Sequence, residues 1–109
     1  NGDDVSNVTT LECTFFQSTS FNGNLSRWDV SNVTSLYCTF NGATSFNGDL
    51  SRWDVSKVTN MFCMFERATS FDQQLGDAWA RSRASKTCMF LRSPGSIAGM
   101  TNDASGTPV

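Results

Sequence analysis

The sequence predicts an α/β solenoid, a stack of about four coils of 25 residues in which neighbouring coils share one core. Three observations predict this fold. The first is that the segment 26–31, Ser-Arg-Trp-Asp-Val-Ser, returns unchanged at 51–56. The second is that the cysteines follow one another at steps of 25, at Cys13, Cys38, Cys63 and Cys88. The third is that apolar residues keep the same step, at Phe15, Phe40, Phe65 and Phe90, at Phe21, Phe46 and Phe71, and at Leu25, Leu50 and Leu75.

A short strand is expected to begin each coil. In the best-formed unit, polar residues separate Leu50, Trp53, Val55 and Val58, and Trp28 holds the place of Trp53 one repeat earlier. This alternation and these residue types are typical of a strand that is buried on one face. We therefore expect a strand at 53–55 and a core built on the repeated Trp, Phe and Leu positions.

A helix of about two turns, or a 3₁₀ turn, is expected to follow, so that short parallel strands line one face of the stack and short helices or 3₁₀ turns line the other. Met61, Met64, Phe65 and Ala68 are spaced i, i+3, i+4 and i+7, which places them on one face of a helix. A polar residue at 59 or 60 is available as the N-cap, and Asn-Gly turns at 22–23 and 47–48 lead back to the next strand. One strand, one short helix and one turn per unit is the composition of a leucine-rich repeat. The alternative is a β-helix-like solenoid, with 61–65 on a strand.

The coils are expected at about 1–24, 25–49, 50–74 and 75–92, followed by a Gly/Ser/Thr-rich cap or tail at 93–109. The repeat decays at both ends: the first coil lacks its Leu and Trp, and Trp79 stands one place late in the last. Degenerate end repeats are typical of solenoid caps, which must face water. No apolar run approaches the ~20 residues that span a bilayer, and no signal-peptide pattern opens the chain. We expect a mature chain or part of something longer.

The repeats resemble the BspA-type leucine-rich surface-protein family. The segments that carry the resemblance are Leu-Ser-Arg-Trp-Asp-Val-Ser-Asn-Val-Thr at 25–34, Thr-Asn-Met-Phe-Cys-Met-Phe at 59–65 and Ala-Thr-Ser-Phe-Asp-Gln-Gln-Leu at 68–75. The likeness covers residues 4 to about 75 well and 76–92 loosely, and leaves out the tail. It implies secreted or surface-anchored proteins, often adhesins or large arrays, with no catalysis by the repeat. The chain departs from the family pattern in its cysteines and in having only about four coils.

Composition argues against an enzyme. The chain has no His, which removes Cys–His catalysis and Cys₂His₂ zinc sites. The cysteine spacing is unlike the Cys-x₂-Cys motif of zinc sites, and no phosphate-binding glycine loop occurs. A net charge of −2 with 17% charged residues gives no broad attraction to nucleic acid or anionic membranes. We expect no cofactor and no metal.

The cysteines allow several interpretations. Neighbouring strands lie ~4.7–4.9 Å apart, and a disulfide needs Cα atoms roughly 4.4–6.8 Å apart, so only adjacent coils can be bridged. Packed helices lie ~8–10 Å apart, so a bridge would also predict tight turns. The preferred pairing is Cys13–Cys38 with Cys63–Cys88, which suits an extracellular setting. The rivals are Cys38–Cys63, with the outer two cysteines free to bond neighbouring molecules, and a ladder of four buried free thiols.

Polar columns also recur. Three sequons make Asn7, Asn24 and Asn32 candidates for N-glycosylation. The Asp column at 4, 29 and 54 could hold Ca²⁺, but Arg27 and Arg52 more simply neutralise it. Two Thr columns, at 9, 34 and 59 and at 19, 44 and 69, are expected to serve turns and caps; a flat Thr array for ice binding is a weaker alternative.

The function expected from the sequence is that of an extracellular or cell-surface structural module for adhesion or assembly. Open solenoid ends expose strand edges that a copy of the chain could cover, and such head-to-tail contacts form filaments when they do not close. The alternative is a ligand-binding solenoid that takes a glycan or a protein.

Overall fold

The computed structural model describes residues 5–109, and the Asp4 member of the acidic column lies outside them. In this part of the chain the regular elements are strand β1 (Gln74–Leu75), helix α1 (Asp77–Arg81) and strand β2 (Ser96–Ile97). β1 and β2 pair in parallel, with Gln74 opposite Ser96 and Leu75 opposite Ile97. The remaining backbone consists of turns and, in similar share, of segments without regular structure. No helix among the described residues has the length and apolarity needed to cross a membrane.

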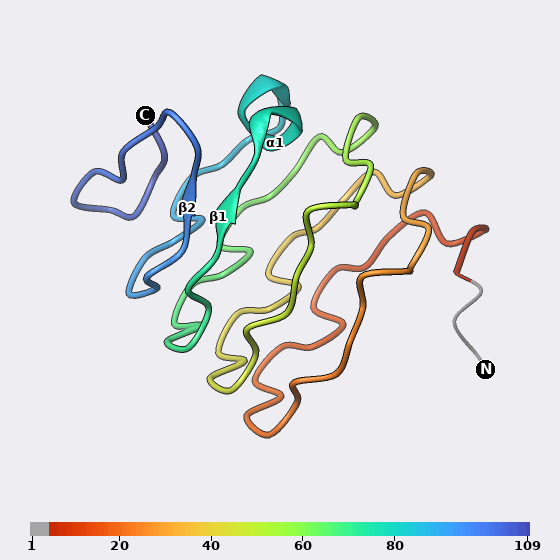
Figure 1. The fold of residues 1–109 in the computed structure, drawn as a ribbon, viewed down its shortest axis with the longest axis horizontal. Coiled ribbons are helices and arrows are strands. Elements are labelled where there is room, and N and C mark those ends of the chain that lie inside the picture. The colour runs from red at the N-terminus through yellow and green to blue at the C-terminus, as the bar shows by residue number, and fades with distance from the viewer. Residues whose placement is uncertain (1–4) are drawn as a thin grey trace.

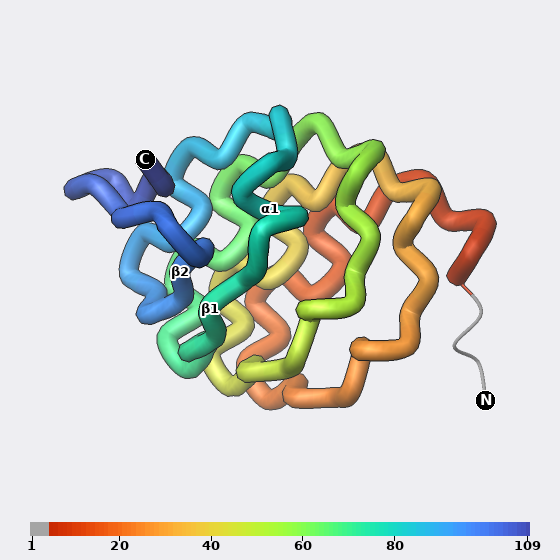
Figure 2. The backbone as a smooth tube through the Cα atoms, turned by 45° about the horizontal axis from the view of Figure 1, so that its top comes forward, coloured from red at the N-terminus to blue at the C-terminus, as the bar shows by residue number. Residues whose placement is uncertain are grey.

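The turns build successive coils that lie side by side along the molecule (Figure 1). We call residues 5–24, 25–49, 50–74 and 75–92 coils 1 to 4. Parallel bridges join each coil to the next at one position, Thr10 to Ser35, Ser35 to Asn60 and Asn60 to Ser85. The tube view shows the same order of coils from the N-terminus to the C-terminus (Figure 2). The 25-residue step of the sequence is therefore also the step between neighbouring coils.

A row of backbone hydrogen bonds connects each coil to the next. In coil 3 the N–H groups at alternate residues donate to carbonyl groups of coil 4 over 2.8–3.0 Å, in the pairs Met61 to Ser85, Cys63 to Thr87, Phe65 to Met89 and Arg67 to Leu91. The N–H groups between them turn back within the coil, Met64 to Met61 and Glu66 to Cys63. Because all of these backbone groups are paired, the coil can pack tightly without regular strands.

The helix expected at 61–68 is not formed, and neither is the strand that the β-helix alternative places at 61–65. Cys63 and Arg67 have φ of 53° and 60°, in the left-handed region that a right-handed helix cannot contain. The physical reason is spacing, since packed helices lie ~8–10 Å apart whereas hydrogen-bonded strands lie ~4.8 Å apart. The apolar stripe is nevertheless buried, with Met61, Met64 and Ala68 all inaccessible.

The strand expected at 53–55 and the N-cap expected at 59 or 60 also differ from the structure. Residues 53–55 have no regular secondary structure, and the Trp53 N–H closes the preceding turn by donating to the Leu50 carbonyl at 3.1 Å. Asn60 is a bridge residue, and its side-chain oxygen accepts the N–H of Phe62 at 2.9 Å. The helix that does form, α1, lies where the repeat has decayed. Asp77 in its first turn and Arg81 in its last complement the helix dipole, and Trp79 is its buried residue.

Stacked phenylalanines fill the interior. One column has ring centroids 5.4–5.5 Å apart and planes within 5° of parallel, at Phe15, Phe40, Phe65 and Phe90. A second column has steps of 5.8 and 5.9 Å, at Phe21, Phe46 and Phe71. Within a coil the two columns touch, with centroids 4.0–4.3 Å apart. The core is completed by Leu25, Leu50, Leu75 and Trp53, all buried, while Phe15, Phe21 and Trp28 of the first coils are half-buried.

The C-terminal end of the stack is covered by a hairpin of residues 101–109, the cap hairpin. Thr101 and Val109 exchange two backbone hydrogen bonds, and Asn102 pairs with Pro108 in antiparallel fashion. The Asn102 side chain donates to the carbonyl of Gly95 at 3.0 Å, which ties the hairpin to the segment before it. Hydrogen bonds from Phe90 and Cys88 to Gly106 and Thr107 place the hairpin against coil 4.

Truncating a stacked ring should lower the free energy of unfolding far more than truncating an exposed ring. Phe65→Ala removes a fully buried ring between two others, and we expect a loss of about 3–5 kcal/mol in the free energy of unfolding. Phe16→Ala is the matched control, because that ring is 45% exposed, and surface changes usually stay within about 0.5 kcal/mol. Urea denaturation of both variants measures the difference. Equal losses would contradict the stacked core.

Candidate functional site

The two ends of the coil stack present different backbone groups. Coil 1 donates from alternate N–H groups to coil 2, so its carbonyl groups at the preceding positions point to the opposite side. Within residues 5–109 no donor reaches these carbonyl groups, which belong to Thr10, Glu12, Thr14 and Phe16. We call this row, with the half-buried rings of Phe15 and Phe21 behind it, the acceptor edge. These four positions are equivalent to those in coil 2, 25 residues later, whose carbonyl groups accept hydrogen bonds from coil 1.

The other end of the stack presents N–H groups, which we call the donor edge. The cap hairpin covers its centre: the N–H of Phe90 donates to the carbonyl of Gly106 at 2.9 Å, and that of Cys88 donates to the Thr107 hydroxyl at 2.9 Å. Within residues 5–109 the outer members of the row, the N–H groups of Lys86 and Arg92, have no acceptor. The hairpin therefore supplies two acceptors where a following coil would supply four.

The cap residues lie outside the repeated positions, so the sequence period did not identify them. A local signal was present in Asp103, whose carboxylate accepts the N–H groups of Ser105 and Thr107 at 2.9 and 3.1 Å. Hydrogen bonds from Ser105 and Thr107 lower the pKa of this carboxyl, with the Ser105 hydroxyl as the largest cause. Asp followed three places later by Gly is a turn pattern, and it closes this hairpin.

The four cysteines form one column on turns of identical shape, with φ between 52° and 56°. All four are free thiols, so the expected Cys13–Cys38 and Cys63–Cys88 bridges are absent from the structure, as is the rival Cys38–Cys63 bridge. Cys38 and Cys63 are buried, Cys88 is half-buried and Cys13 is exposed. The tight turns needed for a bridge are present, but the column is held together by backbone hydrogen bonds instead.

The inner thiols are poorly suited to nucleophilic chemistry. Burial is the main cause that raises the pKa of Cys38 and of Cys63, and Glu66 raises the pKa of Cys63 further. Because the thiolate is the reactive form, a raised pKa lowers reactivity near neutral pH. Tyr37 and Phe62 stack 5.6 Å apart next to this column, a half-buried aromatic pair that the sequence interpretation did not single out.

The three glycosylation candidates, Asn7, Asn24 and Asn32, are exposed. The Asn32 side chain connects three coils, since it donates to the carbonyl of Ser6 at 2.9 Å and accepts from Lys57 at 3.0 Å. A glycan on Asn32 would replace one hydrogen of the nitrogen that makes the first contact. The Asn24 side-chain oxygen accepts the N–H of Ser26, which leaves its nitrogen outside that turn.

The acidic and threonine columns serve the turns and the coil contacts. Asp29 and Asp54 accept the N–H groups of Ser31 and Ser56 at 3.0 Å rather than pairing with the arginines. These serine hydrogen bonds are the main causes that lower the pKa of both carboxyl groups. Among the described residues no group of three or more acidic or thiol side chains is placed to hold a metal. Thr34 and Thr59 donate their hydroxyls to the preceding coil at 3.2 Å, which occupies groups that an ice-binding surface would present.

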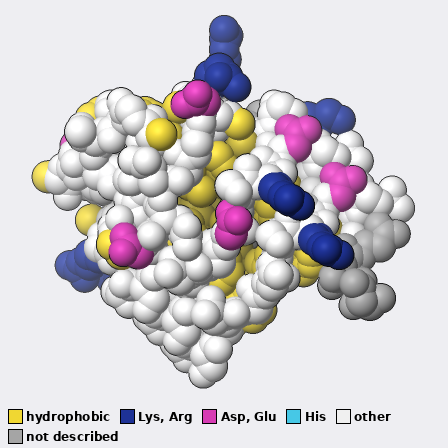
Figure 3. Space-filling view, in the orientation of Figure 1, with side chains coloured by type: hydrophobic (Ala, Val, Ile, Leu, Met, Phe, Trp, Pro, Cys, Tyr) yellow, Lys and Arg dark blue, Asp and Glu magenta, His cyan; other side chains and the backbone are white. Residues whose placement is uncertain are grey.

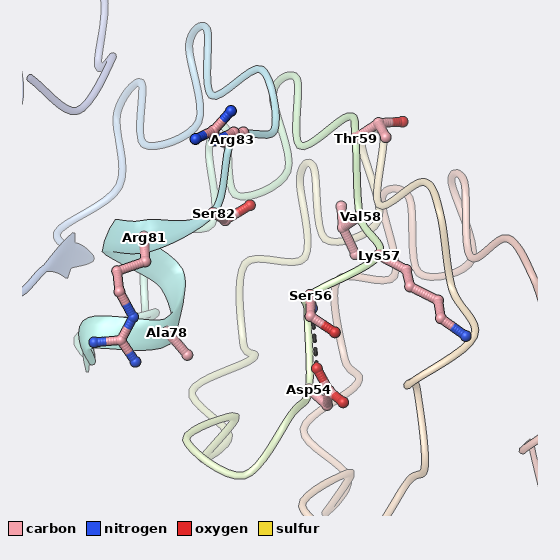
Figure 4. Close-up of a pocket in the computed structure, with 9 residues that line it drawn as sticks. All are labelled: Asp54, Ser56, Lys57, Val58, Thr59, Ala78, Arg81, Ser82 and Arg83. Atoms are coloured by element: carbon pink, nitrogen blue, oxygen red, sulfur yellow. Dashed lines mark hydrogen bonds between the residues drawn. The ribbon is translucent and has the colours of Figure 1, made fainter.

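A cavity of about 490 Å³ separates coil 3 from α1. Figure 3 shows hydrophobic side chains, bordered by polar ones, in the middle of the face that is turned to the viewer in Figure 1. In Figure 4 Ala78 and Ser82 of the α1 region face coil 3, whereas the charged ends of Lys57, Arg81 and Arg83 point away from the space between them. The cavity wall combines Val58 and Ala78 with the polar side chains of Ser56, Thr59 and Ser82.

A register shift explains why coil 4 departs from coil 3 here. The Trp53 indole N–H donates to the Leu25 carbonyl of the preceding coil at 2.9 Å. Trp79, one place late in its repeat, is equally buried, but its indole N–H has no partner. The shift keeps the ring in the core and loses its hydrogen bond.

Comparison with protein families gives one result. The profile of the family described as "Mycoplasma protein of unknown function, DUF285" matches residues 2–99. Because the match spans most of the 109 residues, the chain belongs to this family. It includes coils 1 to 4 and β2 and ends before the cap hairpin. Searches among curated proteins and among solved structures found no match.

The two buried tryptophans should respond differently to the same substitution. Trp53→Phe removes a hydrogen bond and leaves the buried Leu25 carbonyl without its indole donor, whereas Trp79→Phe removes an N–H that has no partner. We expect Trp53→Phe to cost about 1 kcal/mol more than Trp79→Phe in the free energy of unfolding. Urea denaturation measures both. A larger loss for Trp79→Phe would indicate that its N–H is bonded.

Thiol labelling should follow position in the column. We expect Cys13 to react with a maleimide at the rate of an exposed thiol, and Cys63 at least about tenfold more slowly, because each unit of raised pKa lowers the thiolate fraction about tenfold. Peptide mass spectrometry after timed labelling gives each rate. In the urea-unfolded chain the four rates should converge. Equal rates at both cysteines in the folded chain would contradict the burial of Cys63.

Proposed function

We propose that this chain is a non-catalytic structural module of the BspA type, a leucine-rich-repeat-like solenoid that serves adhesion or assembly outside the cell or on its surface. The observation that carries the proposal is the equivalence of the contacts between coils. A protein made of interchangeable contacts can extend or display a surface without any reaction centre.

The equivalence extends to single hydrogen bonds. The cysteine N–H donates to the next coil at 2.9 Å from Cys13, 3.0 Å from Cys38 and 3.0 Å from Cys63. The first column of phenylalanine rings repeats its step within 0.1 Å across the same contacts, at 5.4, 5.5 and 5.5 Å. With the interior committed to packing, the residues outside the columns are free to vary and to meet partners.

Two further features support the proposal. The inner thiols have raised pKa values, which suits a packing role better than a reactive one. The three sequon asparagines are exposed, as carriers of glycans on a secreted protein must be. The extracellular setting itself is carried by the resemblance of the repeats to surface proteins.

Binding of a glycan or a protein segment is the second candidate, and the cavity between coil 3 and α1 favours it. Val58 and Ala78, with Ser56 and Ser82 beside them, offer a small polar ligand both apolar contact and hydrogen bonds.

Adhesion is tested by coating beads with the chain and measuring their retention on immobilised glycoproteins and on one another. We expect more beads to be retained when they are coated with the folded chain than when they are coated with the heat-unfolded chain. A glycan array probed with the same chain separates the second candidate, since a defined glycan would be bound without bead-to-bead adhesion. Retention no better than that of bare beads would overturn the adhesive function.

The stacked-coil interpretation predicts the effect of adding a coil. A second copy of residues 50–74, inserted directly after residue 74, should fit between coils 3 and 4 with the existing contacts on both sides. We expect the melting temperature to rise by about 4 °C or more, the shift that ~1 kcal/mol produces in a domain of this size. Calorimetry measures it, with a scrambled 25-residue insert as control. A melting temperature no higher than that of the scrambled insert would contradict the solenoid.

A further inference from the structure

We propose that the donor edge of coil 4 is the docking surface for the acceptor edge of a second copy of this chain, and that the cap hairpin occupies this surface and holds the chain as a monomer. The inference rests on the proposed assembly function and identifies its surfaces and their control. It follows from three features: the polarity of the edges, the incomplete fit of the hairpin and the position of Gly106.

The polarity of the edges permits only one arrangement of two copies. Four N–H groups of each coil face the C-terminal side, at 61, 63, 65 and 67 in coil 3, and carbonyl groups of the next coil accept them, whereas one bond per contact runs the other way, from Ser85 N–H to the Thr59 carbonyl between coils 3 and 4. Two acceptor edges brought face to face would oppose carbonyl to carbonyl. The acceptor edge of one copy therefore fits only the donor edge of another, head to tail.

The internal contacts indicate what such docking would bury. Thr14 is exposed on the acceptor edge, yet the residues at the same position in the later coils, Thr39, Met64 and Met89, are fully inaccessible. The Thr39 hydroxyl also donates to the Leu11 carbonyl of the preceding coil at 2.9 Å. In a docked pair, Thr14 and the exposed side of Phe15 would take the places that these residues hold inside the stack.

The cap hairpin imitates a following coil but fits less completely. Gly106 and Thr107 accept two N–H groups, where an in-register coil accepts four. The hairpin competes because it is tethered, which gives it a high effective concentration at the donor edge. Once it is displaced, a second copy offers the two missing acceptors and a phenylalanine ring to cover Phe90.

Gly106 is the contact on which the seating of the hairpin depends. It is buried with φ of +76°, and a Cβ atom there would lie 2.2 Å from the Leu91 nitrogen and 2.3 Å from the Leu91 Cα. These are backbone atoms held in coil 4, so they cannot move aside. Gly99 provides a matched control, because it has a similar φ of +80° but open space around its Cβ position. Any substitution strains both backbones, but only at Gly106 does it unseat the hairpin.

The test compares the native chain of residues 1–109 with Gly106→Ala, Gly99→Ala and the double variant Gly106→Ala/Thr14→Lys. Sedimentation velocity over a hundredfold concentration range measures association, and hydrogen exchange at the Cys88 and Phe90 amides reports whether the hairpin is seated. We expect the native chain and Gly99→Ala to remain monomeric with slow exchange. Gly106→Ala should exchange at least tenfold faster at both amides when dilute and form oligomers that lengthen with concentration.

The double variant separates docking from general stickiness. Lysine is tolerated at exposed Thr14 in a monomer but would bury a charge in the docked pair, so we expect the double variant to stay monomeric with fast exchange. Oligomers of the double variant equal to those of Gly106→Ala would overturn the docking surface. A monomeric Gly106→Ala with fast exchange would overturn the assembly claim, and slow exchange would overturn the role of Gly106. Bead adhesion of the native monomer is measured separately, so failure of the docking proposal and failure of the adhesive function can be told apart.

Discussion

Hydrogen bonds from alternate backbone N–H groups of one coil to carbonyl groups of the next are the constraint on which the rest of the structure depends. Because the groups at 61, 63, 65 and 67 point along the stack, those between them must be satisfied within the coil, and tight turns do this. The turns require positive φ at Cys63 and Arg67. The resulting short step between coils brings the phenylalanine rings into contact at 5.5 Å. Stacked rings and paired backbone groups then stabilise the same geometry.

The same constraint gives the stack a direction. Coils 2 and 3 each donate four backbone hydrogen bonds toward the C-terminal side and one toward the N-terminal side, so the two sides of a coil are not alike. At the end of the stack such a side behaves as a sheet edge, which other chains can pair with unless it is covered. The cap hairpin covers the donor edge with residues that lie beyond the family match. The interior is filled by packed hydrophobic side chains, which leaves the edges and outer faces as the surfaces that a partner can reach.

The repeated positions could be predicted from the sequence, and the backbone that carries them could not. The period placed the phenylalanine, leucine and cysteine columns because identical coils bury identical residues. The spacing of Met61, Met64 and Phe65 correctly marked a buried stripe, but a chain of tight turns can bury the same positions as a helix. Which conformation forms is decided by backbone contacts with the next coil, and side-chain patterns do not report them. Where those contacts weaken, as around Trp79, local propensity prevails and a helix appears.

The candidate site was less accessible to sequence reasoning, because its edges consist of backbone groups and its cap lies outside the repeat. The most direct test of the whole account is the measurement of NMR scalar couplings across hydrogen bonds in coil 3. Stacked coils should give couplings from the nitrogens of Cys63 and Phe65 to the carbonyl carbons of Thr87 and Met89, one coil away. Couplings from Phe65 to the carbonyl of Met61, four residues back, would show an α-helix at 61–68 and contradict it.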